Sequence, residues 1–235
     1  MGRALGWLGV IVLALTCAAA PAVAEWNTDL YGGVAWIQST DVDVHAHTGG
    51  VESNLTIFDL DTDTGFTAGL RNGYWFDSLP FLGVDLDISY VQTGVPAQVR
   101  TGTAAFTGKF LGKPISVSES GVASIPSATL PLFGFAPELR ARWPLDVDSD
   151  FPTGRWQPYV SAGPAWAFSL KDSSPVVEFG GKLGAGVAFN LTDFVALFGE
   201  YRFAFYPDFK LTDHNVSYKT DIFNHGFVLG VSLRF

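Results

Sequence analysis

The chain has 235 residues, of which 14% are aromatic, 26 are glycine and only 16% are charged. Its net charge of −9 at pH 7 argues against nucleic acid as a partner, because binding phosphates requires a basic footprint. No apolar run of about 20 residues follows the N-terminal segment, so a membrane-like composition without membrane helices favours a β-barrel.

The first 24 residues have the pattern of a secretory signal peptide. Arg3 supplies the positive start, Leu8–Leu15 the apolar core and residues 22–24 a small-residue cleavage site. We therefore expect residues 1–24 to be removed on export and residues 25–235 to form one domain. A lipoprotein signal at Cys17 is the alternative, but the three residues before it fit a lipobox poorly. If Cys17 leaves with the signal, no disulfide or thiol nucleophile is available.

Eight later segments alternate apolar with small or polar residues at period two, as strands with two different faces do. They cover residues 28–40, 64–76, 82–90, 129–143, 156–170, 176–190, 194–206 and 222–235. The third is the clearest, because Leu82, Val84 and Leu86 alternate with Gly83 and Asp85. In the fourth, Pro137 predicts a bulge or a missing ladder bond, since proline cannot donate one.

The connections alternate between short and long, as in outer-membrane barrels. Turns near residues 77–80, 144–155 and 191–193 are predicted to face the periplasm. Loops near residues 41–63, 94–127, 171–175 and 207–220 are predicted to face outward, and residues 94–127 to form a loop or a ribbon standing clear of the sheet.

Four motifs and the C-terminal residue carry a family resemblance. The motifs are TDLYGGVAW, QPYVSAGPAWAF, LTDFVALFGEYRF and GFVLGVSLRF, and the chain stops on Phe235. Together they resemble the small eight-stranded outer-membrane barrels, both the OmpA-like transmembrane domain and the OmpX-type family. The resemblance implies an all-β, eight-stranded antiparallel up-and-down transmembrane β-barrel in the cell outer membrane, without a cofactor. It also implies a monomer, contact with outer-membrane lipid and lipopolysaccharide, and Phe235 as part of the signal that the assembly machinery reads.

Charged residues on the polar faces are predicted to fill the lumen. They are Arg71, Asp85, Asp87, Glu138, Arg140, Arg142, Glu178, Lys182, Glu200, Arg202 and Arg234. An eight-stranded barrel is just wide enough for side chains to fill, and buried charges need partners, so we expect salt bridges that close the lumen. A narrow path for water or ions is the alternative. Asp85 and Asp87 could imitate a catalytic pair, but the nearby arginines favour salt bridges.

One outer segment carries metal-capable residue types at period two. They are Asp41, Asp43, His45 and His47. If the strand continues beyond the membrane, the four share one face and could ligate a metal. We prefer a solvated strand extension whose charges protect an exposed edge, so no metal site is predicted.

Aromatic residues near strand ends are predicted to form the belts at the membrane interfaces. They are Trp36, Tyr74, Trp75, Tyr90, Trp143, Trp156, Tyr159, Trp166, Tyr201 and Tyr206.

Three functions are open from the sequence. The leading hypothesis is a structural or surface-interaction barrel that holds acidic loops at the cell surface. A narrow porin-like passive channel is the alternative, and a lipid-modifying outer-membrane enzyme is the third. We predict no enzyme, because none of the four histidines is followed two places on by serine, as the His-x-Ser motif of PagL-type deacylases requires. His225 is expected to face lipid without a partner.

Overall fold

The computed structural model describes residues 25–48, 51–110, 113–169, 176–213 and 216–235. The predicted signal peptide and the loop at 171–175 therefore lie outside the described residues. The described chain forms the strands β1 (Glu25–Ile37), β2 (Thr40–Thr48), β3 (Val51–Leu60), β4 (Asp63–Phe76), β5 (Leu79–Val95), β6 (Gln98–Phe110), β7 (Lys113–Ile125), β8 (Ala128–Arg142), β9 (Trp156–Ser169), β10 (Val176–Asn190), β11 (Val195–Asp213) and β12 (Val216–Arg234). No helix long and apolar enough to cross a membrane occurs in the described part of the chain.

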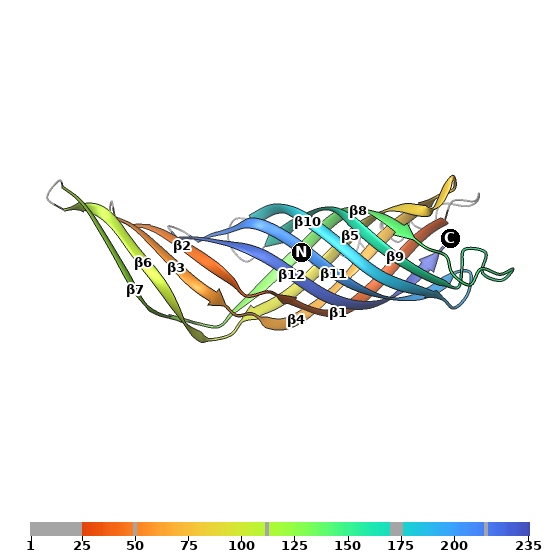
Figure 1. The fold of residues 1–235 in the computed structure, drawn as a ribbon, viewed down its shortest axis with the longest axis horizontal. Helices are drawn as coiled ribbons and strands as arrows, with labels where there is room; N and C mark the ends of the chain where they lie inside the picture. The colour runs from red at the N-terminus through yellow and green to blue at the C-terminus, as the bar shows by residue number, and fades with distance from the viewer. Residues whose placement is uncertain (1–24, 49–50, 111–112, 170–175, 214–215) are drawn as a thin grey trace, which may run out of the picture.

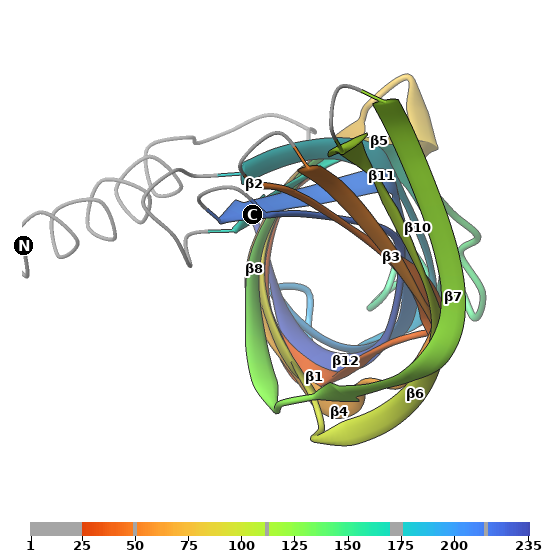
Figure 2. The same cartoon turned by 90° about the vertical axis from the view of Figure 1, so that its left-hand side faces the viewer.

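Eight of these strands form a closed barrel. They pair antiparallel in the order β1-β4-β5-β8-β9-β10-β11-β12, and β1 closes the ring by pairing with β12 from Asn27↔Arg234 to Ile37↔Asn224. Figure 2, which looks along the barrel, shows the ring. The predicted eight-stranded antiparallel barrel is confirmed, and each of the eight predicted strands lies in its wall.

The other four strands extend the wall beyond the barrel. The hairpin β2–β3 pairs with the outer part of β12 through Val216↔Ala46 to Thr220↔Val42, and the hairpin β6–β7 pairs with it through β3. The outer parts of β11 and β12 with β2, β3, β6 and β7 thus make one sheet, which we call the extension (left in Figure 1). The expectation of a ribbon standing clear of the sheet was therefore wrong for residues 94–127, because β3 pairs with β6 over six residues.

Pro137 interrupts one ladder, as predicted. β8 and β9 pair up to Phe135↔Trp166 and again from Leu139↔Ala162, while no pairs are formed between them. The register is the same on both sides, so ladder bonds are missing but there is no bulge. The two backbones approach closely here, because a Cβ on Gly163 would lie 2.0 Å from the Pro137 carbonyl oxygen. Glycine is therefore required at this position.

The two faces of the wall exchange polarity where the barrel becomes the extension. In the barrel the outer face is apolar, with Leu30 and Leu183 about half exposed, and the inner face is polar. In the extension the inner face carries Val42, Ile57 and Phe209, all buried. Its outer face carries polar residues, such as the cross-strand pair Lys219↔Asp43. Because only hydrocarbon favours an apolar exterior, the exchange marks the outer boundary of the membrane-spanning wall.

The predicted aromatic belt is wrong for three of its ten residues. Trp75, Tyr159 and Tyr206 are buried and face the lumen, whereas Trp143 and Trp156 are about half exposed on the outside. Position near a strand end does not decide which face a side chain occupies, and in a strand the alternation does.

Candidate functional site

The lumen holds a network of buried ion pairs, and Arg71 lies at its centre. Arg71 is fully buried; its Nε donates to Asp29 Oδ2 at 2.8 Å and its Nη1 to Glu200 Oε2 at 2.7 Å. Arg140 contacts the same Asp29 oxygen at 3.3 Å and Asp85 Oδ1 at 2.7 Å. These residues come from β1, β4, β5, β8 and β11, so the network spans the barrel from wall to wall.

A second layer lies between this network and the outer end. Lys182 Nζ contacts Asp87 Oδ1 at 2.9 Å and Glu138 Oε1 at 2.6 Å. Arg202 donates to Glu200 Oε1 at 2.6 Å and contacts Asp87 Oδ2 at 3.3 Å. The Arg202 guanidinium also lies 3.7 Å from the centre of the Tyr31 ring, whose hydroxyl donates to Asp87 at 2.9 Å. The predicted candidate catalytic pair, Asp85 and Asp87, is thus divided between different cationic partners.

The end of the barrel that is predicted to face the periplasm is covered by the connection between β8 and β9. Arg142 pairs with Glu25 at 2.6 Å, and Arg234 contacts the same carboxylate at 3.2 Å. Gln157 and Asn190, which are buried, donate to backbone carbonyls of the connection at 2.7 Å each. The long turn therefore folds over the mouth, leaving an open hollow of about 780 Å³.

Ten of the eleven predicted lumen residues are buried inside the barrel. Glu178 is different, because it lies half-buried near the outer end of β10 and accepts a hydrogen bond from the Lys210 backbone at 3.2 Å. Sequence reasoning missed Glu25 and Asp29. The alternation of the first strand placed Asp29 opposite Leu30 and could have found it, whereas Glu25 precedes the predicted strand. The resulting network contains six acidic and six basic residues, so the described lumen is neutral overall.

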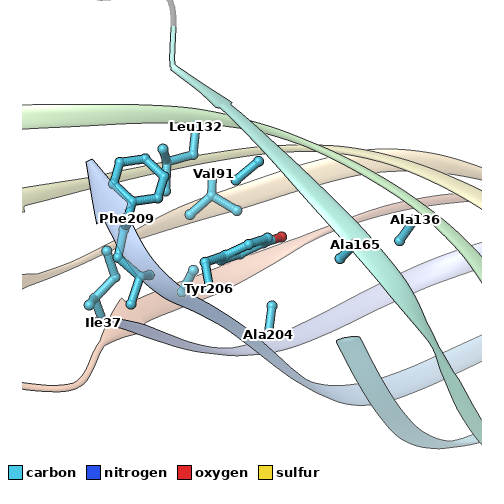
Figure 3. Packing of buried hydrophobic residues seen from close by; sticks show 11 residues of the cluster. Ile37, Val91, Leu132, Ala136, Ala165, Ala204, Tyr206 and Phe209 are labelled. Carbon is cyan, nitrogen blue, oxygen red and sulfur yellow. The ribbon is translucent and has the colours of Figure 1, made fainter. Parts of the chain in front are cut away.

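Small and apolar side chains fill the outer half of the lumen (Figure 3). The cluster consists of Ala35, Ile37, Val91, Leu132, Ala136, Ala165, Ala167, Ala204, Tyr206, Phe209 and Ile222. A cavity of about 40 Å³ lies between it and the ion pairs, next to Arg202 and Asn224. Another of about 10 Å³ lies beside Arg140. These volumes hold about three water molecules and one, respectively.

Three of the four metal-capable residues of β2 each have a separate partner. The Asp41 carboxylate accepts from the Asp59 backbone at 3.0 Å, Asp43 accepts from Thr56 at 2.7 Å, and His45 Nδ1 lies 2.6 Å from Asn54. The side chain of His47 lies outside the described residues. No group of three histidine, cysteine or acidic side chains suited to a metal occurs in the part of the chain that the structure describes.

His225 has a partner, contrary to expectation. Its Nδ1 lies 2.7 Å from the Tyr201 hydroxyl, and its ring stacks on Trp36 with centroids 5.5 Å apart. The pairing of β12 with β11 brings Tyr201 to His225, and its pairing with β1 brings Trp36, which residue spacing alone did not indicate.

The C-terminal residue is tied to the first strand. The Phe235 backbone exchanges hydrogen bonds with Trp26, at 2.9 and 3.0 Å, and its ring is about half exposed. Its role as an assembly signal stays a prediction.

Comparisons with known proteins agree with this architecture. No curated protein matches the chain in sequence. Among solved structures, the fold is similar to Neisserial surface protein A, at 13% identity over 92% of this chain and 100% of that one, with a TM-score of 0.48. It is also similar to the outer membrane protein OprG from Pseudomonas aeruginosa, at 13% identity over 89% and 95%, with a TM-score of 0.47. The family model described as outer membrane protein beta-barrel domain matches residues 10–235, and the chain belongs to this family.

Proposed function

We propose that this protein is an outer-membrane barrel with a closed lumen, which anchors the extension at the cell surface for interaction with partners. The filled lumen is the observation that carries the proposal. A conducting path would have to pass both the apolar cluster and twelve paired charges. Opening the path through the charges would separate buried pairs, and each separated partner would be left uncompensated. The lumen therefore suits a structural role better than transport.

The extension supports the second half of the proposal. It continues the wall beyond the apolar exterior that suits hydrocarbon, and both of its faces carry accessible side chains. Phe106, Val117 and Tyr218 on its inner face are about half exposed. A protein surface that exposes apolar side chains together, bordered by polar ones, commonly marks a site of interaction.

We further propose the cellular setting that this role requires. Residues 1–24 direct export, the apolar outer wall contacts outer-membrane lipid and lipopolysaccharide, and the last strand, which ends at Phe235, carries the assembly signal. One chain suffices for the barrel, because β1 pairs with β12. We therefore expect the barrel to be a monomer within its membrane.

Planar-bilayer recordings test the closed lumen. We expect silence from the wild-type chain, while an open porin in the same bilayer serves as positive control. The variant Tyr206→Gly/Phe209→Gly removes the two largest side chains of the apolar cluster and leaves the ion pairs, so it should also be silent. Steady, reproducible conductance from the wild-type chain would overturn the proposal in favour of a narrow channel.

The Tyr201–His225 contact favours one alternative, a lipid-modifying enzyme, since it lies on the lipid-facing side near the outer boundary. However, neither residue contacts a carboxylate among the interactions of the described residues. Mass spectrometry of lipid A from cells with and without the protein distinguishes the two functions. We expect an unchanged acyl pattern, and a changed pattern would favour the enzyme.

A further inference from the structure

The extension is an open sheet with two different edges. It ends with β7 on one side, and on the other side with the outer part of β11, beyond its last pair with β10 at Gly181↔Phe205. An open edge presents unpaired backbone donors and acceptors, and proteins normally protect such edges with prolines, bulges or charges. The two edges of the extension differ in this protection.

The β11 edge is protected in several ways. Pro207 lacks a backbone donor, Asp208 has a left-handed backbone with φ of 54°, and the register shifts between Tyr206 and Phe209. Beyond this bulge, the Lys210 backbone N–H donates to the Glu178 side chain at 3.2 Å. A further strand could therefore not add to this edge in regular register.

The β7 edge is less protected between Ser116 and Ser124, where Glu119 is the single charged residue. The segment contains no proline and no basic residue, and its pairing with β6 runs without a register shift. Side chains from Ser116 to Val122 are exposed, with Val117 at 52% and Val122 at 75%. In Figure 2, β7 is the outermost strand of the extension. Such an edge is suited to receive another strand.

We propose that β7 pairs antiparallel with β7 of a second copy of this chain, with Ser120 on the twofold axis. This inference rests on the proposed surface role. In this register Glu119 faces Gly121, Val117 faces Ala123, and Ser120 faces its own copy. Centring the pair on Glu119 instead would oppose two carboxylates directly, which is destabilising. The register centred on Ser120 avoids this repulsion.

The orientation of the barrel axis relative to the sheet determines in which membrane the second copy lies. An antiparallel pair that keeps the apolar inner faces of both sheets on one side requires a twofold axis perpendicular to the sheet. Because the extension continues the wall along the long axis of the barrel (Figure 1), such a rotation reverses that axis. A twofold axis along the barrel would instead place the apolar face of one copy beside the polar face of the other. The second copy therefore belongs to a facing membrane, and the pairing joins two surfaces.

Cysteine cross-linking tests the register. We use the full chain with Cys17→Ala, reconstituted into lipid vesicles, and oxidise the vesicles after mixing. Ser120→Cys should give disulfide-linked dimers, Ser118→Cys alone should not, and Ser118→Cys/Val122→Cys should give them again. Equal cross-linking of the two single variants, or none from Ser120→Cys, would overturn the proposal.

A charge exchange tests whether the pairing occurs between membranes. Wild-type vesicles should aggregate, as measured by light scattering. Ser120→Lys or Ser120→Glu alone should weaken each pair by up to about fivefold through repulsion between like charges, an effect that many contacts per vesicle multiply. A mixture of Lys and Glu vesicles should aggregate again. Heat-dependent gel mobility confirms that each variant barrel is folded.

The outcomes separate this inference from the function on which it rests. Absence of wild-type aggregation, undiminished aggregation of Ser120→Lys vesicles, or a mixture that fails to recover would each refute the pairing. If bilayer recordings remain silent in that case, the closed-lumen barrel stands and only the identity of its partner is wrong. Conductance would refute the closed lumen whatever the vesicles do.

Discussion

Replacing Arg71 by Met removes the charge at the centre of the lumen network. Arg71 is fully buried and pairs with Asp29 and Glu200 at 2.8 and 2.7 Å. Breaking a buried ion pair by removing one partner usually costs about 3–5 kcal/mol. Asp29 keeps Arg140 at 3.3 Å and Glu200 keeps Arg202 at 2.6 Å. We therefore expect the lower end of that range.

A loss of about 3 kcal/mol lowers the ratio of folded to unfolded protein roughly a hundredfold. Urea-induced unfolding in lipid vesicles, followed by tryptophan fluorescence, measures this change. The double variant Arg71→Met/Glu200→Gln restores equal numbers of acids and bases, and the Gln carbonyl can still accept from Tyr159. We expect its free energy of unfolding to lie within about 1 kcal/mol of the wild-type value.

Two results would contradict this reasoning. If Arg71→Met costs less than about 1 kcal/mol, water or rearrangement compensates the charges, and the network does not contribute as buried pairs do. If the double variant is as unstable as the single one, the loss comes from packing around the guanidinium and not from charge balance. Tyr159 and Phe198, whose rings lie 5.7 and 5.4 Å from the guanidinium carbon, would then be the residues affected.

Three further changes test other parts of the fold. Gly163→Ala should cost about 1–3 kcal/mol through overpacking against the neighbouring carbonyl, whereas Gly181→Ala, with its nearest atom at 4.0 Å, should be close to neutral in the same unfolding assay. Phe209→Ala should cost about 3–5 kcal/mol, because it empties a site that is 1% exposed; an unchanged unfolding midpoint would show that the cluster is not packed. The Asp208 carboxylate accepts a hydrogen bond from Lys219 at 2.7 Å, which holds its pKa below 3.8. The contribution of this pair is therefore present above pH 3.8 and is lost as the pH falls through the lowered pKa. Lys219→Met should raise the NMR titration midpoint of Asp208, and no movement would refute the coupling.

The sequence predicts the barrel well because alternation is a local property. One strand suffices to assign Arg71, Asp85 or Arg202 to the inner face, and eight such strands of suitable length imply the ring. The height of a residue along the axis is not local. Glu178 shares the face of Lys182 but lies opposite Ala167 of the apolar cluster, away from the ion pairs, where it accepts a hydrogen bond from the β11 backbone.

Contacts between strands account for what the sequence did not predict. The partner of His225 depends on the register of β11 against β12, and the extension depends on β3 pairing with β6, which neither segment encodes alone. Three aromatic residues were assigned by position and not by face, although the alternation of their own strands was available. Asp29 was missed in the same way. The candidate site was thus predictable in composition, while its pairwise contacts required the structure.

The ion pairs of the lumen also bear on how the chain reaches its native state. Arg71 and Glu200 are 129 residues apart, and Arg142 and Glu25 are 117 apart. The first contact joins the second and seventh strands of the ring, and the other joins the first and fourth. Contacts over such sequence separations slow folding. An incomplete barrel would expose these ionic groups to hydrocarbon. Insertion into the membrane before the ring closes would therefore contribute little favourable free energy. We therefore expect these ion pairs to form late in folding, when the strands that carry them have come together.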